Sequence, residues 1–243
     1  MRYFTYISNW FEIMEEMGNV FEIPELRDET GVFWNREHAG KVLSDMLLSF
    51  KNSDSIVLGI PAGGVPVAAP IASNLGLDLD VAVVSKITLP WNTESGYAAV
   101  AFDGTVKLNN EVVSQTGLTK DEIKNGIEKA NKKVQRRFRE FRGIKPFPYV
   151  QDRNVMLVDD GIASGFTMIV AIEALKNTGA NKIIIAVPTA HLKSLELITP
   201  MVDTVFCANI RGGWGFAVAD AYKNWCDVEE DEVIGILDEY MLD

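Results

Sequence analysis

Residues 155–167 combine three segments that together predict part of a parallel α/β sheet. Residues 155–158 are all apolar, the adjacent carboxylates Asp159 and Asp160 follow, and after a glycine-bearing turn the apolar residues recur at helical spacing. A short apolar run that ends in turn residues and leads into a helical period predicts a strand, a loop and a helix. A strand–loop–helix unit of this kind favours an open α/β sheet.

The loop after this strand has the properties of an anion site. Amides at a helix N-terminus have no intrahelical acceptor and the macrodipole adds positive potential there, while Gly161 and Gly165 let the main chain approach an anion. Ser164 and Thr167 can add hydroxyl donors. The acid pair would repel phosphate unless it bound something else, and sugar hydroxyls or a Mg²⁺ ion are suitable partners.

Residues 158–167 resemble the 5-phosphoribosyl-1-pyrophosphate (PRPP) loop of the type I phosphoribosyltransferases. The resemblance implies that Asp159 and Asp160 are catalytic acids that hold the ribose diol, directly or through Mg²⁺ and water. The alternative is an ordinary βα turn with an acidic N-cap, which requires one acid where this chain has two. The resemblance also implies a cradle for the 5′-phosphate, formed by Gly161, Ile162, Ala163, Ser164, Gly165 and Thr167.

A second apolar strand, residues 55–60, also ends in a turn rich in glycine and is followed by a helix. Such a turn could hold a second anion. Relatives usually carry Arg or Lys where this chain has Ala62, so pyrophosphate would here be held by backbone amides and by groups from elsewhere. By the resemblance this turn is the pyrophosphate loop, with the binding residues Pro61, Ala62, Gly63 and Gly64.

Residues 80–86 predict the next strand, which ends at Lys86. Ligands bind beyond the carboxyl ends of the strands in open α/β sheets, so a lysine at that position could meet one. The resemblance implies that Lys86 contacts pyrophosphate or the loop acids, although relatives generally have an arginine where Ser85 stands. A solvated lysine at a strand end explains the residue equally well.

Residues 87–110 differ in character from the strands before them. Asp103 and Gly104 stand between two short apolar segments, a pattern that predicts a hairpin. Residues 89–96 contain a proline, a glycine and no buried period. We therefore expect a mobile loop before the hairpin.

The family closes a flexible loop of this kind over the reacting ribose, and water is thereby excluded. The resemblance assigns Trp91, Asn92 and Glu94 to this flexible loop. More narrowly, the motifs resemble those of a group of prokaryotic predicted phosphoribosyltransferases whose base is unassigned. That likeness extends over roughly residues 33–240.

Residues 118–143 predict a long amphipathic helix, with Thr119 as N-cap and Glu122 at capping-box distance. RNA binding would favour aromatic residues interleaved with the cations, and there are none. Residues 227–243 contain eight acids and no Lys or Arg. A solvated basic face, or one that meets this acidic tail within or between subunits, is therefore the favoured interpretation. The basic face consists of Lys129, Lys132, Lys133, Arg136 and Arg137.

The last third of the chain predicts two more buried strands, residues 182–187 and 204–207. In relatives a residue after such a late strand helps to frame the base. Trp214 and Phe216 follow here among glycines, and an exposed aromatic ring can stack on a planar base. Ordinary packing of the two rings between the last strand and helix is the alternative.

Composition narrows the possible functions. A formal charge of −11 argues against general nucleic-acid binding, although it leaves room for a polyphosphate carried with Mg²⁺. Two cysteines without a CxxC motif or a Cys/His cluster indicate neither a disulfide framework nor a zinc site. The N-terminus makes a poor signal peptide, and the longest apolar run is broken by prolines and glycines. We therefore expect a cytoplasmic protein without a membrane span.

Residues 1–34 are rich in aromatic side chains, and apolar residues between Trp10 and Met17 recur at helical spacing. Such a face usually packs on a core or on a partner subunit, so we expect a homodimer. Asn35 is a suitable N-cap for the helix that follows. Arg36 could reach a phosphate, but an arginine in the first turn of a helix is more commonly at the surface.

These observations predict an open, mainly parallel α/β sheet with helices on both faces, the type I phosphoribosyltransferase fold, with a small hood and a flexible loop and hairpin. Residues 1–34 are expected to form an N-terminal extension that contributes to the hood or a dimer contact. Residues 35–243 are expected to form the phosphoribosyltransferase domain. Within it, residues 87–110 would be the flexible loop and hairpin, and residues 209–243 a C-terminal hood with the acidic tail.

The implied reaction transfers the 5-phosphoribosyl group from Mg-PRPP to a nucleobase with release of pyrophosphate, a step of nucleotide salvage. The sequence does not name the base. A regulator that senses PRPP or a nucleotide without turnover is the alternative, because Ala62 and Ser85 stand where cations are usual. A generic dinucleotide-binding protein is disfavoured, because the first βα turn lacks GxGxxG.

Overall fold

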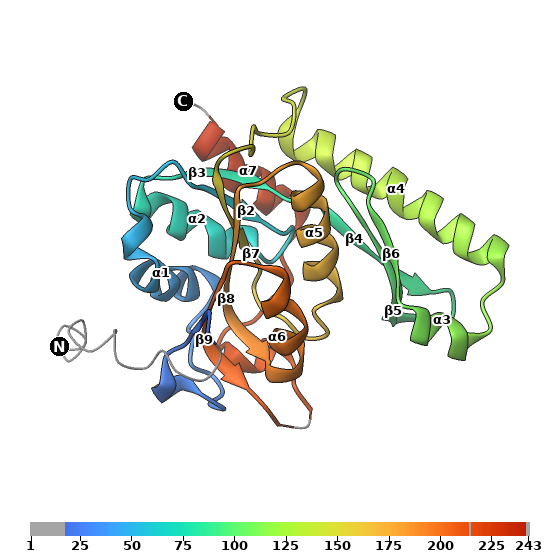
Figure 1. Ribbon diagram of the computed structural model, residues 1–243, viewed down its shortest axis with the longest axis horizontal. Helices are drawn as coiled ribbons and strands as arrows, with labels where there is room; N and C mark the ends of the chain where they lie inside the picture. Colours follow the sequence, from blue (N-terminus) through green and yellow to red (C-terminus); the bar gives the residue numbers. More distant parts are fainter. Residues whose placement is uncertain (1–17, 214, 242–243) are drawn as a thin grey trace.

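The computed structural model describes residues 18–213 and 215–241, and only the backbone of residues 93–95 and 241. Its main sheet has six strands in the order β1-β9-β8-β7-β2-β3, and every neighbouring pair is parallel. A second sheet, β4-β5-β6, is antiparallel. Figure 1 shows the second sheet as part of an arm that extends from the body of the molecule. The predicted open α/β sheet is therefore confirmed.

The central strands of the main sheet are the apolar runs of the sequence, and nearly all of their residues are buried because helices cover both faces. In the register Gly59 pairs with Val158, and Val158 pairs with Ala186. Strands β2, β3 and β7 therefore end at the same level, β8 and β9 continue to His191 and Arg211, and the loops that follow the strands lie at one edge of the sheet. The six strands are β1 (Val20–Phe21), β2 (Ile56–Gly59), β3 (Asp78–Val81), β7 (Asn154–Val158), β8 (Lys182–His191) and β9 (Thr204–Arg211).

Helices α1 (Arg36–Met46) and α2 (Val65–Leu75) cover one face of the main sheet, and α5 (Phe166–Asn177) covers the other (Figure 1). The short helix α6 (Leu192–Ile198) lies beside β8, and α7 (Glu230–Met241) packs against α2, β3 and the arm. Four 3₁₀ helices complete the connections: η1 (Pro24–Leu26), η2 (Leu48–Phe50), η3 (Thr199–Met201) and η4 (Val218–Ala221).

The arm contains β4 (Val84–Leu89), β5 (Asn92–Ala101), β6 (Val106–Leu108), α3 (Asn110–Thr116) and α4 (Lys120–Arg142). The predicted hairpin at Asp103 and Gly104 is confirmed, and Gly104 has φ +89°, a backbone conformation that favours glycine. The predicted capping box of α4 is also confirmed, because Thr119 and Glu122 satisfy each other's backbone amides. The apolar face of α4 packs on β4 and β5.

Two local predictions for this region are wrong. Residues 80–86 do not form one strand, because β3 ends at Val81 and β4 starts at Val84 in the other sheet. The Ala82 amide still donates to the Gly59 carbonyl, and the chain then turns out of the main sheet. Residues 89–96 are not an open loop, because β5 already begins at Asn92 and pairs with β4 in an irregular register.

Residues of the predicted N-terminal extension, 1–34, join the body of the fold and contact the C-terminal part of the chain. Strand β1 pairs with β9, and this pairing adds residues near the N-terminus to the edge of the main sheet. Phe33 bridges to Tyr222, and their rings are tilted with centroids 5.7 Å apart. The predicted helical face between Trp10 and Met17 lies outside the described residues.

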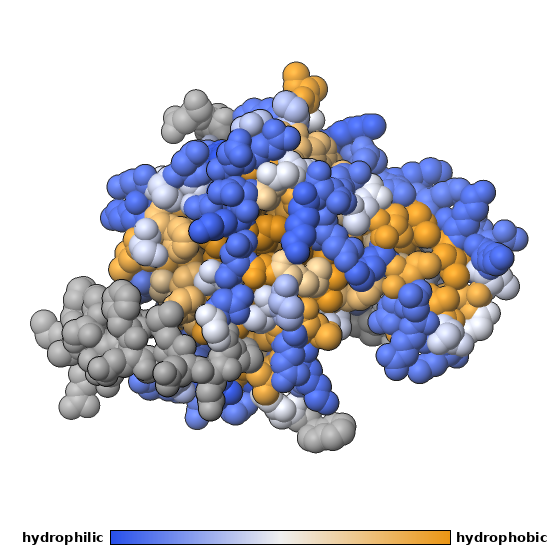
Figure 2. Space-filling model, in the orientation of Figure 1, coloured by the Kyte–Doolittle hydropathy of each residue, from blue (hydrophilic) through white to orange (hydrophobic). Residues whose placement is uncertain are grey.

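The surface is mixed on the face that Figure 2 shows, with many hydrophilic side chains over the body and apolar side chains gathered over the arm. Val106 of β6 is one of the exposed apolar residues. Within residues 18–213 and 215–241, no helix combines the length and the apolar composition needed to cross a bilayer.

Candidate functional site

The two glycine-bearing turns meet at the carboxyl edge of the main sheet. The Ile60 amide donates to the Val158 carbonyl at 2.8 Å, which joins the ends of β2 and β7. A Cβ at Gly63 would overlap the carboxylate of Asp160, and one at Gly64 would lie 2.5 Å from the Val158 carbonyl oxygen. Only glycine permits this approach, so the turn at 61–64 is built against the acid pair.

Helix α2 starts directly behind this turn, with Gly64 at its N-cap and a proline in its first turn. The peptide bond between Pro61 and Ala62 is cis. Pro61 is buried and Ala62 is half-buried. The Gly64 amide donates to the Ile60 carbonyl, the Val65 amide donates to the Ala62 carbonyl, and Pro66 has no amide hydrogen. Of the four predicted pyrophosphate residues, only Ala62 and Gly63 therefore keep amides for which no described residue is an acceptor.

The predicted phosphate loop leads into α5 through Gly165, which has φ +75°. Ala163 and Ser164 are exposed, and the Ser164 hydroxyl accepts a hydrogen bond from the Phe166 amide. The Ile162 amide donates to the Thr189 carbonyl, which ties the loop to β8. The amides that remain for an anion are therefore those at the start of α5, not that of Ile162.

Asp159 and Asp160 lie at the base of this loop. Burial raises the pKa of the Asp159 carboxyl well above its ordinary value, and the neighbouring Asp160 charge raises it further. Burial also raises the pKa of Asp160, while the Arg36 guanidinium acts in the opposite direction. The acids are costly to ionise together, so hydroxyl donors or a cation would stabilise the pair.

Arg36 is a member of this site that the sequence interpretation placed at the surface, and that interpretation is wrong. Both Nε and Nη2 of Arg36 lie 2.8 Å from Oδ2 of Asp160, and the side chain is 9% exposed. Asn35 caps α1 by accepting from the His38 amide, as predicted. Helix α1 precedes β2 and runs in the opposite direction to it, so the first turn of α1 lies at the carboxyl edge of the sheet.

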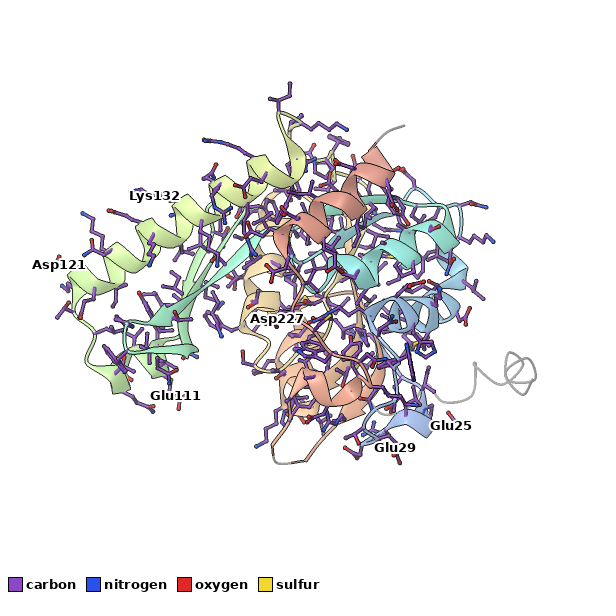
Figure 3. The ribbon with its side chains drawn as sticks, turned by 180° about the vertical axis from the view of Figure 1, so that it is seen from behind. Glu25, Glu29, Glu111, Asp121, Lys132 and Asp227 are labelled. Atoms are coloured by element: carbon purple, nitrogen blue, oxygen red, sulfur yellow. The ribbon has the colours of Figure 1, made fainter. Side chains whose placement is uncertain are left out.

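A segment after β9, residues 222–228, crosses the same site, and we call it the strap. The Tyr222 hydroxyl donates to the Asp160 carbonyl at 2.6 Å, and the Trp225 ring centroid lies 3.9 Å from Cζ of Arg36. Arg36 also donates through Nη1 to the Cys226 carbonyl at 2.7 Å. In Figure 3 Asp227, at the end of the strap, lies in the middle of the molecule, where the chain turns into α7.

Burial raises the pKa of Tyr222 well above its ordinary value, and the nearby Asp160 charge adds to the effect. Tyr222 therefore keeps its proton and stays a donor. A further segment, at Val218 in η4, touches the phosphate loop, since a Cβ at Gly161 would lie 2.5 Å from Val218 Cγ1. The C-terminal segment thus covers both the acids and the start of the loop.

Lys86 was predicted to lie at the carboxyl end of a parallel strand. That prediction is wrong, because β4 belongs to the antiparallel sheet of the arm. Lys86 points away from α4, since the neighbouring Ile87 faces that helix near Gly126. Its methylene groups lie against Gly96 of β5. Trp91 and Asn92 are exposed where β4 turns into β5. The side chain of Glu94 lies outside the described residues.

The predicted base residues are only partly described. Phe216 meets the His191 ring edge-on with centroids 5.5 Å apart, and Cζ of Arg211 lies 5.0 Å from the Phe216 ring centroid. Trp214 lies outside the described residues. A hollow of about 440 Å³ adjoins this ring and is lined by Asp28, Arg211, Gly212, Gly213 and Phe216.

The basic face of α4 meets the acidic tail within the chain, which is one of the two arrangements that the charge pattern favoured. Arg136 and Arg137 both bind Glu230 at the start of α7, at 2.8 and 2.6 Å. Lys132 projects from the outer side of α4, as Figure 3 shows. The acidic tail therefore neutralises part of the basic face within one chain.

Within the described part of the chain, no three His, Cys, Asp or Glu side chains gather as a ready-made metal site. Mg²⁺ is commonly bound by one or two carboxylates together with substrate phosphates and water. The half-buried pair of Asp159 and Asp160 beside an anion loop fits that pattern.

Comparison with known proteins agrees with the geometry. A phosphoribosyl transferase domain model matches residues 35–221. A protein found in two strains of Mycobacterium tuberculosis, provisionally assigned as a phosphoribosyl transferase, is 34% identical over 207 residues. These are 85% of this chain but 46% of the relative, so this chain spans about half the length of the curated relatives it matches.

Among solved structures, the crystal structure of TT1426 from Thermus thermophilus is 29% identical, with a TM-score of 0.68. The match covers 86% of this chain and 98% of the Thermus chain. The fold described above is therefore largely shared with that protein.

Proposed function

Because the chain belongs to the phosphoribosyl transferase family, we propose that it transfers the 5-phosphoribosyl group of Mg-PRPP to a nitrogenous base and releases pyrophosphate. The observation that carries this proposal is the contact between the turn at 61–64 and the acid pair. An anion at each turn would leave the acids between them. That is the arrangement needed for a sugar with a phosphate at one end and a pyrophosphate at the other.

In this proposal the amides at the start of α5, with the Ser164 and Thr167 hydroxyls, bind the 5′-phosphate. Asp159 and Asp160 bind the ribose hydroxyls. The turn at 61–64 binds pyrophosphate through backbone amides, and Lys86 on the arm adds a positive charge. Phe216, from the segment after β9, would contact the base.

The proposed reaction breaks the C1–O bond to pyrophosphate and forms a C1–N bond to the base, while the base loses a proton. Charge builds up on the leaving pyrophosphate and on the ribose ring as this bond breaks. Fixed donors at 61–64 would stabilise the negative charge on pyrophosphate, and the fixed carboxylates would stabilise the positive charge on the ribose ring, provided that water is excluded. A bound Mg²⁺ would supply further charge neutralisation of the pyrophosphate.

A PRPP-sensing protein without turnover is the second candidate. Ala62 and Ser85 stand where relatives usually carry cations, and two missing cations weaken stabilisation of the leaving group more than they weaken ribose binding. The two candidates share the same ligand site and differ only in the chemical step.

Pyrophosphate release from PRPP and Mg²⁺, measured across a panel of purine, pyrimidine and xanthine-like bases, separates the candidates. Release with one base supports the transferase. Saturable PRPP binding without release on any base supports the sensor. Failure of PRPP to bind contradicts both.

A further inference from the structure

Arg36 is a cation that contacts the acid pair directly, although the family resemblance did not assign it to the site. Its guanidinium is stacked on the Trp225 ring, bonded to the Cys226 carbonyl and paired with Asp160. A buried arginine held on three sides loses much of its freedom to move toward a ligand. It is therefore fixed in place before any ligand arrives.

The geometry of the pair leaves part of Asp160 available. Arg36 places both Nε and Nη2 on the same oxygen, Oδ2. Among the described residues, none donates a hydrogen bond to Oδ1 of Asp160. In Asp159, Oδ1 accepts from the Asp160 amide at 2.9 Å, and no described residue donates to Oδ2. Each acid thus keeps one oxygen for an incoming donor.

The charge of the site depends on Arg36 as well. Two adjacent carboxylates repel each other, and both repel phosphate. The Asp160 carboxylate lies between Arg36 and Gly63. Arg36 therefore supplies a cation near the turn at 61–64, where Ala62 stands in place of the cation that relatives usually carry. Arg36 reduces the negative charge beside that turn without occupying the turn itself.

We propose that Arg36 is a positioning residue for PRPP binding: it holds one oxygen of Asp160 so that the other, with the free oxygen of Asp159, faces the two ribose hydroxyls. This inference rests on the proposed function. Arg36 acts through Asp160 and does not touch the reacting atoms. The strap is part of the device, because Trp225 and the Cys226 carbonyl fix the guanidinium from behind.

The strap residues Trp225 and Cys226 lie beyond residue 221, where the match to the family model ends. The stacking of Arg36 therefore depends on a segment that this comparison does not include. Removing the stacking partner should weaken PRPP binding even though no strap side chain is assigned to the ligand.

The test measures the dissociation constant of Mg-PRPP by calorimetry for the full chain and for Arg36→Met, Arg36→Lys, Asp160→Asn and the double variant Arg36→Met with Asp160→Asn. We expect Arg36→Met to lose roughly 10- to 100-fold in affinity, because a charged hydrogen-bonded pair is broken. Arg36→Lys keeps the charge but not the planar fork, so it should recover part of that loss.

The double variant separates positioning from simple structural support. Since Arg36 acts through Asp160, its loss should matter much less once Asp160 is neutral, and the two effects should be strongly non-additive. Additive effects, or unchanged affinity in a folded Arg36→Met variant, would overturn the inference. If Arg36→Met does not fold, Arg36→Lys and Trp225→Leu serve instead, and unchanged affinity in both would overturn it as well.

Arg142→Met is the matched control, because it breaks another buried arginine–aspartate pair, and neither residue of that pair forms a hydrogen bond or an ion pair with Asp159 or Asp160 in the described part of the chain. Thermal unfolding of every variant shows whether the affinity is measured on folded protein. Failure of the unaltered protein to bind PRPP contradicts the proposed function itself, whereas binding that ignores Arg36 contradicts only this inference.

Discussion

Arg142 and Arg36 are both buried, both bind an aspartate and both lie against aromatic rings, but their carboxylate partners are used differently. Arg142 binds Asp80 with one nitrogen on each carboxylate oxygen, both at 2.6 Å, and the Val81 amide also donates to Asp80. Arg36 binds only one oxygen of Asp160. The first pair is complete, while the second leaves an acceptor for something else.

The difference follows from where the two pairs lie. Asp80 is in β3 and Arg142 ends α4, so their pair joins the arm to the edge of the main sheet. Asp160 lies at the carboxyl edge, where the sheet presents its loops. In the proposed function the Arg142–Asp80 pair therefore serves packing and the Arg36–Asp160 pair serves ligand binding, because of the two aspartates only Asp160 has a carboxylate oxygen that its arginine does not bind.

Breaking the Arg142–Asp80 pair should have the largest effect. Arg142→Met leaves the Asp80 charge buried without its partner, which should lower the free energy of unfolding by about 3–5 kcal/mol. Urea denaturation followed by circular dichroism measures this loss. The affinity for PRPP, measured on folded protein, should be nearly unchanged.

The double variant Arg142→Met with Asp80→Asn is the control for this prediction. It removes the stranded charge and should recover part of the stability. If folded Arg142→Met lost PRPP affinity as well as stability, the two pairs would not have separate roles.

The site pair can be disturbed without removing any charge. Gly63→Ala places a methyl group against the Asp160 carboxylate, which must then move relative to Arg36. We expect a loss of roughly 10-fold or more in PRPP affinity, in line with the loss of a charged hydrogen bond. Calorimetric titration with Mg-PRPP gives the number.

Gly235→Ala in α7 is a matched control for that experiment, because a Cβ there meets no atom within 4 Å. It should leave affinity unchanged and raise helix stability by about 0.5–1 kcal/mol. Equal PRPP affinity in Gly63→Ala and Gly235→Ala would argue against the placement of the ligand between the two turns.

The exposed cluster of Glu230 with Arg136 and Arg137 should have the smallest effect. The arginines hold the pKa of Glu230 down to about 2, below its ordinary value of 4.5. A depressed carboxyl pKa stabilises the fold above pH 4.5 and loses that contribution as the pH falls toward 2. Because the cluster is partly solvated, Glu230→Gln should cost no more than about 1 kcal/mol.

Urea titrations of the unaltered protein and of Glu230→Gln at neutral pH and at about pH 3 check the sign. The difference in the free energy of unfolding between the unaltered protein and Glu230→Gln should be larger at neutral pH. A difference that grows on acidification would contradict the assignment.

The sequence was sufficient to predict that the turns at 61–64 and 159–167 meet at one edge of the sheet. Both follow continuous apolar strands, and parallel strands place their carboxyl ends at one edge. The capping box of α4 and the Asp103–Gly104 hairpin were also predictable, because each depends on residues near one another in the chain.

Arg36 and the strap were not predictable in the same way. Tyr222 and Arg36 reach Asp160 across sequence separations of 62 and 124 residues, and no local pattern encodes those contacts. The available signal was topological, because a helix that precedes a parallel strand begins at the edge where ligands bind.

The break between β3 and β4 was missed for another reason. Residues 81–84 are uniformly apolar and buried, with no glycine or proline to mark the change of sheet. Burial in one sheet or the other satisfies such a run equally well, so the position of Lys86 depended on tertiary structure.

Calorimetric titration of Mg-PRPP into the unaltered protein and into the Asp159→Asn, Asp160→Asn double variant tests the central claim most directly. If the acid pair holds the ribose between two anion-binding turns, the unaltered protein binds PRPP and the double variant loses roughly 100-fold or more in affinity. If PRPP does not bind, or binds equally well to both proteins, the assignment of this site to PRPP is wrong.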